Sequence, residues 1–149
     1  MRVLALDQAA KCGYAVFING KLMDHGLIDL SKLDNNIKLR AILKERITNL
    51  IIQHNIDTLL YENIYAANRK TYNVLAKLQG TIQDLANQYG IHSEEVSSRH
   101  WRNVLIDGKA SKEDVRQFLL KKYKKLPGDL DENTSDAIAI GLSWVIDNK

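Results

Sequence analysis

Apolar positions in the first thirty residues follow the pattern of extended strands. Residues 2–7 form a nearly continuous apolar run that ends in Asp7, which predicts a central strand covered on both faces. A second strand is predicted over residues 13–18, and the following Asn19-Gly20 pair is a strong hairpin-turn signal. A third strand is expected from residue 21 to about residue 30. The chain should therefore open with three antiparallel strands.

The next segments predict helices that alternate with strands. Apolar residues recur at helical spacing over residues 35–54, which indicates an amphipathic helix. Residues 57–62 predict a fourth strand, parallel to the first because a helical crossover joins the two. A second long helix is predicted over residues 70–89 and a weak fifth strand over residues 91–96.

The remainder of the chain is predicted to be helical. A short helix over residues 98–105 should end before Asp107-Gly108. Residues 111–114 resemble a capping box and should begin a helix that ends at about residue 123. The last helix is expected over the apolar residues 137–145, opened by the polar stretch 131–136. These elements predict a mixed five-stranded α/β sheet flanked by helices.

Length and composition suit one intracellular domain. The chain has 149 residues, 45% of them hydrophobic, which is enough for one core, so residues 1–149 are expected to form a single domain. The single Cys12 excludes an internal disulfide and a cysteine-built zinc site. No apolar run approaches the roughly 20 residues of a membrane span, and the first residues lead into a strand rather than a signal peptide. We therefore expect a cytoplasmic protein.

Three acidic residues end or begin predicted core elements. Asp7 ends the first strand, Glu62 ends the fourth, and Asp136 opens the last helix. A carboxylate at the buried end of a strand is costly unless a cation or a proton neutralises it. The three positions therefore predict one shared site for a divalent metal. Two plainer interpretations stay open: Asp7 as a turn residue, and Glu62 as the partner of a lysine.

Charge is distributed unevenly around the net value of +3. Residues 99–125 hold nine Lys or Arg and three acids, so this segment carries +6 and the rest of the chain −3. A basic block beside an acidic, metal-seeking remainder suits a polyanionic substrate whose phosphates reach a metal. A solvated lysine-rich helix face explains the same charges equally well.

Four motifs together resemble the RuvC family of Holliday junction resolvases. Leu6-Asp7 followed by Gly13-Tyr14-Ala15-Val16 resembles the opening of these enzymes, and Tyr61-Glu62-Asn63-Ile64-Tyr65 is similar to their Ile-Glu-Gln-Val-Phe motif. Lys112-Glu113-Asp114-Val115 resembles Lys-Ala-Gln-Val, and Ser135-Asp136-Ala137-Ile138-Ala139-Ile140 resembles Ala-Asp-Ala-Leu-Ala-Ile. The motifs stand in the family's order and span almost the whole chain.

The resemblance implies an RNase H-like fold and Mg²⁺-dependent cleavage of branched DNA, usually by a homodimer. Carboxylates are hard ligands suited to Mg²⁺ or Mn²⁺, and two ions could activate a water and stabilise the departing oxygen. Asp7, Glu62 and Asp136 are the implied metal ligands. Lys112 matches the family lysine that lies close to the scissile phosphate, where it could stabilise developing charge.

One position departs from the family pattern. The family usually carries an Asp three residues before its last acid, where this chain has Asn133. Asn offers a carbonyl oxygen but no charge, so metal affinity should weaken. Glu132 lies on much the same helical face as Asp136 and is a candidate to compensate as a ligand. Two origins of Asn133 stay open: a natural residue and an introduced inactivating change. Asp131 is expected to be a helix-start residue.

Aromatic and basic residues are candidates to hold DNA. Tyr65 stands where the family places an aromatic that stacks on an unpaired base, although packing against the next helix is an alternative. Candidates for phosphate contacts are Arg69, Lys70, Arg102, Lys109, Lys112, Lys121 and Lys124. Trp101 and Trp144 are predicted core residues, and the four histidines show no metal-ligand spacing.

Three rival functions share features with this sequence. An RNase H-like nuclease of structured RNA would share the fold and the acids. A non-catalytic junction binder would follow if Asn133 impairs metal binding. A sugar-kinase or actin-like ATPase also opens with strand, Asp and turn, but it needs a Gly-rich turn where this chain has Gln8-Ala9-Ala10, and a second domain. A phage enzyme that debranches DNA and a host repair enzyme both fit the composition.

Overall fold

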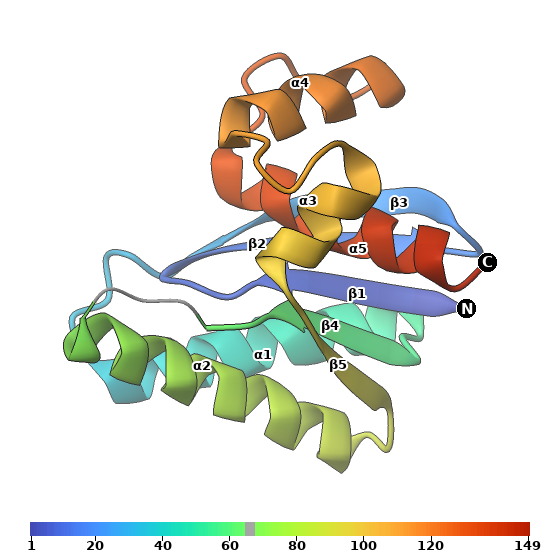
Figure 1. Ribbon diagram of the computed structural model, residues 1–149. Helices are drawn as coiled ribbons and strands as arrows, with labels where there is room; N and C mark the ends of the chain where they lie inside the picture. The colour runs from blue at the N-terminus through green and yellow to red at the C-terminus, as the bar shows by residue number, and fades with distance from the viewer. Residues whose placement is uncertain (65–67) are drawn as a thin grey trace.

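A five-stranded mixed sheet forms the centre of the computed structural model, which describes residues 1–64 and 68–149 (Figure 1). The strands are β1 (Arg2–Asp7), β2 (Lys11–Ile18), β3 (Lys21–Asp29), β4 (Thr58–Glu62) and β5 (His92–Val96). Their order across the sheet is β3-β2-β1-β4-β5. The pairs β1–β2 and β2–β3 are antiparallel, whereas β1–β4 and β4–β5 are parallel. This is the mixed sheet that the sequence predicts.

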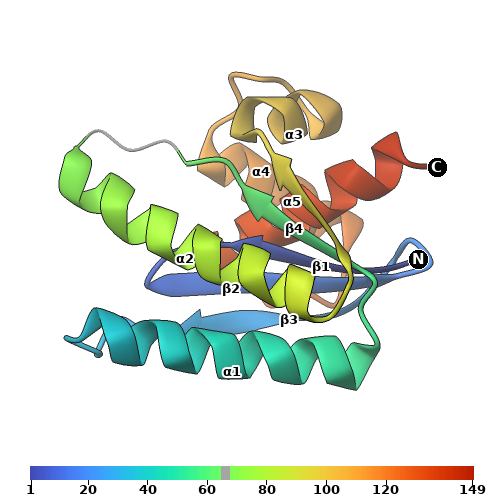
Figure 2. The same ribbon diagram turned by 90° about the horizontal axis from the view of Figure 1, so that it is seen from below.

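Five helices within the described residues cover the two faces of the sheet. They are α1 (Asn36–His54), α2 (Arg69–Gln88), α3 (Ser98–Leu105), α4 (Lys112–Lys122) and α5 (Glu132–Asp147). Figures 1 and 2 show α1 and α2 side by side on one face and the other three helices on the opposite face. Among the described residues, no helix combines the length and the apolar character needed to cross a membrane.

Alternating residues of the central strand β1 enter two separate cores. Leu4 and Leu6 pack with the apolar face of α1 and α2, while Val3 and Ala5 pack with α3, α4 and α5. All four side chains are fully buried. Each core removes a large apolar area from water, and this burial is the main term that holds helices on both faces. The prediction of a central strand covered on both faces is confirmed.

Local signals fix the turns and helix ends. Asn19 and Gly20 both have positive φ, as a tight hairpin turn of this kind requires. Asp131 caps α5 by accepting a hydrogen bond from the Thr134 backbone N–H, and Ser111 and Asp114 form the capping box of α4. The largest differences from the predicted bounds are at the starts of β2 and α5. Strand β2 begins at Lys11 rather than at residue 13, and α5 already begins at Glu132.

Candidate active site

Two of the predicted acids meet at one edge of the sheet because their strands are parallel neighbours. Leu6 of β1 pairs with Tyr61 of β4, and Asp7 and Glu62 are the next residue of each strand. The carboxyl ends of parallel strands open on the same edge, where ligands commonly bind in α/β sheets. The strand register thus brings together two carboxylates that are 55 positions apart in the sequence.

The third acid arrives from the last helix. Helix α5 packs across β1 and β2, and its first turn lies on Gly13, the residue that pairs with Asp7 in the β1–β2 ladder. Asp136, one turn further along α5, is 6% exposed. Because α5 starts at this edge of the sheet, Asp136 lies in the same cleft as Asp7 and Glu62. The three acids that the sequence singled out are brought together.

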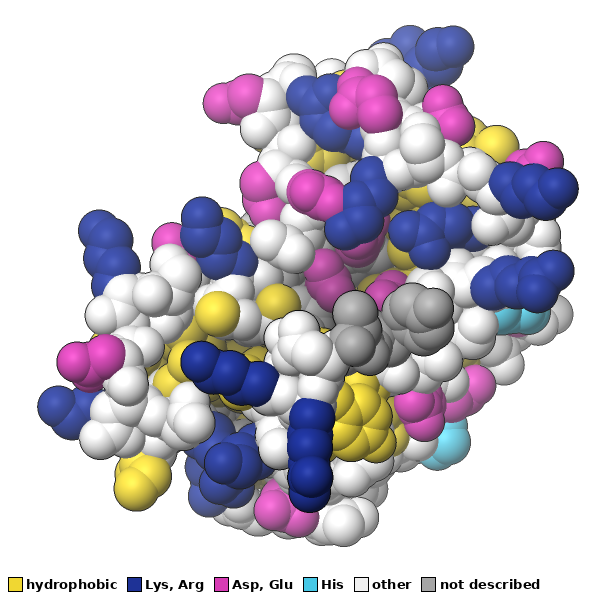
Figure 3. All heavy atoms as spheres, turned by 60° about the vertical axis from the view of Figure 1, so that its left-hand side comes forward, with side chains coloured by type: hydrophobic (Ala, Val, Ile, Leu, Met, Phe, Trp, Pro, Cys, Tyr) yellow, Lys and Arg dark blue, Asp and Glu magenta, His cyan; other side chains and the backbone are white. Residues whose placement is uncertain are grey.

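The cleft has a volume of about 470 Å³. Its lining includes the three acids together with Asn133, Arg102 and Lys112. Figure 3 shows this face as a hollow with acidic side chains at its centre and Lys and Arg side chains around it. An acidic floor with a basic rim suits a phosphodiester that must approach a cation held by carboxylates.

Crowding of negative charge is unfavourable in this cleft. Burial, and then the nearby carboxylates of Asp136 and Glu62, raise the pKa of Asp7 to about 8. Burial is also the largest cause that raises the pKa of Asp136 to about 7, and it raises the pKa of Glu62. Each acid would be neutralised by a proton or by a cation. Buried, mutually repelling carboxylates are the donor set that a hard divalent ion relieves.

Lys112 supplies positive charge at the rim of the cleft. Its ammonium forms an ion pair with Glu132, and the Nζ atom lies 4.0 Å from Asp136 Oδ2. The hydrogen bond to Glu132 is the main cause that raises the pKa of Lys112. Lys112 is the first residue of α4, so the capping box at Ser111 also sets the place of this side chain.

Two residues beside Glu62 were not predicted as parts of a site. The side-chain amide of Gln8 accepts a hydrogen bond from the Glu62 backbone N–H at 3.1 Å and donates one to the Glu62 carbonyl oxygen. The indole Nε1–H of Trp101 donates to Glu62 Oε2 at 2.8 Å. Trp101 is a buried core residue, as predicted, but its polar atom faces the cleft acid.

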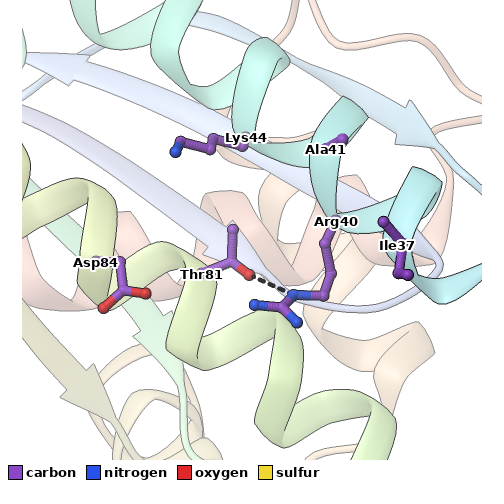
Figure 4. Close-up of a pocket in the computed structure, with 6 residues that line it drawn as sticks. All are labelled: Ile37, Arg40, Ala41, Lys44, Thr81 and Asp84. Atoms are coloured by element: carbon purple, nitrogen blue, oxygen red, sulfur yellow. Dashed lines mark hydrogen bonds between the residues drawn. The ribbon is translucent and has the colours of Figure 1, made fainter.

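A second hollow lies on the other face of the sheet, between α1 and α2 (Figure 4). Ile37, Arg40 and Lys44 line it from α1, and Thr81 and Asp84 from α2. Arg40 Nε donates to Thr81 Oγ1 at 3.2 Å, which joins the two helices. None of the predicted site residues that the structure describes lies in this hollow, so it adds nothing to the acidic cleft.

Comparison with known proteins gives a concordant result. The family model described as crossover junction endodeoxyribonuclease RuvC matches residues 3–144. The chain belongs to the RuvC family. No protein of curated function matches it by sequence.

Solved structures of RuvC and of other resolvases share the fold. Thermus thermophilus RuvC is 17% identical, with a TM-score of 0.81, over 96% of this chain and 92% of that chain. The yeast mitochondrial Holliday junction resolvase is 14% identical, with a TM-score of 0.68, over 97% and 77%. The fowlpox virus resolvase, solved with substrate Holliday junction DNA, is 15% identical, with a TM-score of 0.62, over 99% of both chains. The RNase H-like fold is thereby confirmed.

The RuvC family position that is usually Asp is Asn133 here, and it lines the cleft. The backbone carbonyl of Asn133 packs against Gly13, and this contact holds the start of α5 in place. Glu132 does not lie among the residues that line the cleft. Its exposed carboxylate is paired with Lys112 instead. Its role as a compensating metal ligand stays a prediction.

The predicted DNA-binding residues occupy different parts of this RuvC-family fold. Arg102 and Lys112 line the cleft, and Arg69 and Lys70 are exposed at the start of α2, whose Thr71 also lines it. Lys109 is exposed in the loop between α3 and α4. Lys121 lies in the last turn of α4 and Lys124 just beyond the end of the helix, and neither lines the cleft. Tyr65 lies outside the described residues.

Proposed function

We propose that this protein is a divalent-metal-dependent, structure-selective endonuclease that cuts phosphodiesters at Holliday junctions and other branched DNA. The observation that carries the proposal is the convergence of Asp7, Glu62 and Asp136 in one cleft rimmed by Lys112 and Arg102. Membership of the RuvC family supports the reaction. The fowlpox virus resolvase, a structural neighbour, was solved with Holliday junction DNA, which supports the substrate.

The donor set fits Mg²⁺, with Mn²⁺ as a substitute, although the acids do not form a finished cage. Across residues 1–64 and 68–149, no three His, Cys, Asp or Glu side chains are grouped closely enough to hold an ion. Glu62 accepts a hydrogen bond from Trp101, and the Lys112 ammonium lies near Asp136. We infer that Asp7, Glu62 and Asp136 hold two ions, with the Asn133 amide oxygen as a neutral donor.

The ions would activate the attacking water and stabilise the departing 3′ oxygen. Around them, this chain's residues bind and orient the DNA. Arg102 and Lys112 offer charge to phosphates at the rim, and Lys112 would stabilise charge that develops on the scissile phosphate. Arg69, Lys70 and Lys109 would hold more distant phosphates, and Lys121 and Lys124 flanking duplex. Stacking of Tyr65 on an unpaired base stays a prediction.

Paired cuts across a four-way junction favour a homodimer, because the junction has near two-fold symmetry and needs two active sites. The apolar residues of α2 are candidates for the dimer interface, and a core face is the alternative that explains most of them. Leu78, Ile82 and Leu85 are buried in the core beside α1 and the sheet. A dimer would therefore use side chains other than these three. Light scattering of the protein with four-way DNA should show two copies per junction, and monomers alone would reject the dimer.

A substrate panel tests the proposed function. Four-way, three-way, flap and linear DNA, together with a structured RNA, would be incubated with Mg²⁺ or Mn²⁺. We expect cuts in the branched DNAs, strongest in the four-way junction, and none in RNA. Asp7→Asn should abolish cutting and leave junction binding intact, since removal of a carboxylate reduces repulsion of the phosphates. Cleavage of RNA alone would reject the proposal.

One competing function has a specific observation in its favour. Asn133 gives the cleft one negative charge fewer than the family pattern, which favours a protein that binds junctions without cutting them. Tight junction binding with no cleavage at any Mg²⁺ or Mn²⁺ concentration would support that alternative. We place either activity in the cytoplasm of a bacterial or a phage-infected cell, because branched DNA arises there.

A further inference from the structure

Trp101 combines complete burial with a polar contact to the active-site cleft. Its side chain is fully buried within the core formed with α4 and α5, and its Nε1 lies 2.8 Å from Glu62 Oε2. A buried indole N–H needs an acceptor, and most buried indoles in proteins find one. The acceptor here is a carboxylate that lines the cleft. The contact links the rigid core to a proposed metal ligand.

The hydrogen bond settles how the Glu62 carboxylate is presented. It takes one acceptor site of Oε2, and no hydrogen bond from the described residues reaches Oε1, which is therefore available to a cation. A ligand that is already oriented loses less freedom when an ion binds.

The surroundings of Trp101 keep the contact in place. Gln8, 6% exposed, holds both the N–H and the carbonyl of Glu62, so the backbone that carries this carboxylate is fixed as well. On the side of the cleft, the Arg102 Cζ atom lies 4.4 Å from the centre of the Trp101 ring. This cation–π contact covers the indole and places the guanidinium at the rim. Glu62 is thus held at both its backbone and its side chain.

We propose that Trp101 is a positioning residue of the metal site, whose indole N–H holds the Glu62 carboxylate in the orientation that binds the ion. The proposal rests on the metal dependence of the proposed function, but it concerns ion binding and not DNA cleavage. Outer partners of metal ligands typically change metal affinity by roughly 10–100-fold when they are removed. Trp101→Phe keeps an aromatic ring in the core and removes the donor together with the second ring of the indole.

The first experiment measures Mn²⁺ binding from the free-ion signal in electron paramagnetic resonance, without DNA. We expect Trp101→Phe to weaken Mn²⁺ binding roughly 10-fold relative to the unaltered protein. Trp144→Phe is a matched control, because Trp144 Nε1 donates to Glu94 Oε2 at 3.0 Å outside the cleft. It should bind Mn²⁺ normally. Equal affinity in Trp101→Phe, with a circular dichroism spectrum that shows a folded protein, would overturn the proposal.

A second experiment does not require Trp101→Phe to fold. The chain has two tryptophans, so ¹⁵N-tryptophan labelling gives two indole N–H resonances, which Trp144→Phe assigns. We expect the Trp101 resonance to move on addition of Mg²⁺ and in Glu62→Ala, and the Trp144 resonance to stay unchanged in both. A Trp101 resonance that ignores both changes would overturn the proposal.

The two experiments separate this proposal from the proposed nuclease function. Normal Mn²⁺ binding that depends on Trp101, in a protein that cuts no nucleic acid, would reject the nuclease function and support the role of Trp101. Junction cleavage with Mn²⁺ affinity unaffected by Trp101→Phe would reject the role of Trp101 and support the nuclease.

Discussion

Gly13 of β2 packs so closely on Asn133 of α5 that a Cβ atom at position 13 would lie 2.0 Å from the Asn133 carbonyl oxygen. Because Gly13 pairs with Asp7 in the β1–β2 ladder, this contact seats the first turn of α5 beside the edge that carries Asp7. Asp136 follows one turn later. Because Gly13 has no side chain, α5 can pack closely enough to bring Asp136 near Asp7.

Replacement of Gly13 by alanine should displace α5 and separate the acids. The added Cβ meets backbone atoms, which cannot rotate away as a side chain does, so we expect a loss of about 1–3 kcal/mol in the free energy of unfolding and a marked loss of cleavage. Gly80→Ala is the control: nothing lies within 4 Å of its Cβ position in α2. It should stabilise the protein by about 0.5–1 kcal/mol, because alanine favours a helix interior. Urea titrations measure both effects, and an unchanged Gly13→Ala protein would contradict this close-packing argument.

Neutralising Asp7 should stabilise the metal-free protein, and more so as pH rises. The pKa of Asp7 is raised from 3.8 to about 8 in the folded state, so folding favours its proton. The resulting stability is complete below pH 4 and is lost as pH rises toward 8. Asp7→Asn should therefore raise the melting temperature by a few degrees at pH 8 in a chelator and change it little at pH 4.

Two measurements check this pH dependence. Asp29→Asn is the control, because hydrogen bonds from Ser31 lower the pKa of Asp29 and its removal should bring no gain at pH 8. Addition of Mg²⁺ should raise the melting temperature of the unaltered protein and leave that of Asp7→Asn almost unchanged. If Asp7→Asn melts lower than the unaltered protein at pH 8 without metal, charge repulsion does not control this cleft.

Restoring the family acid at position 133 should strengthen metal binding. Asn133 lines the cleft, and a carboxylate there adds a charged oxygen ligand where an amide now offers a neutral one. We expect Asn133→Asp to lower the Mg²⁺ concentration needed for half-maximal cleavage by about tenfold or more. The same substitution should lower stability without metal, because it adds a fourth acid to three that already repel. Mg²⁺ titrations of cleavage and melting curves in chelator provide the two measurements, and equal Mg²⁺ requirements would assign Asn133 to the packing of α5 alone.

Glu132 should restrain Lys112 until DNA arrives. The two side chains form an exposed ion pair, which is screened by salt and worth only about 0–1 kcal/mol. Glu132→Gln should therefore cost little stability, free the ammonium for phosphate, and tighten junction binding at low salt by a fewfold. Glu113→Gln is the matched control, because it removes the ion-pair partner of Arg116, and both of these residues lie on α4. If Glu132→Gln instead weakens Mg²⁺ binding as much as loss of a cleft acid does, Glu132 acts as a metal ligand.

The features of this protein that could be predicted from its sequence are those that depend on the local pattern of residues. The turn at Asn19-Gly20, the cap at Asp131 and the burial of Trp101 each follow from chemistry within a few residues. The meeting of Asp7 and Glu62 also followed, because strand parity and a helical crossover leave few arrangements.

Contacts between distant side chains could not be predicted. The bond from Trp101 to Glu62 depends on how α3 docks beside β4, and the hold of Gln8 on the Glu62 backbone depends on a side chain reaching across the strand ends. The pairing of Glu132 with Lys112 likewise depends on how α4 docks on α5. These contacts decide how the acids are presented, although they leave no trace in hydrophobic periodicity.

Because of the order in which the acids occur along the chain, the active site is completed only when the last helix is in place. Asp7 belongs to the first strand and Glu62 to the fourth, whereas Asp136 belongs to the last helix, which packs on β1 and β2. A growing chain that has already formed all five strands still lacks one acid, and it lacks the last helix that covers β1 and β2. A protein that cuts DNA is therefore inactive until its folding is complete. Partial unfolding of α5 would inactivate it before the sheet itself unfolds.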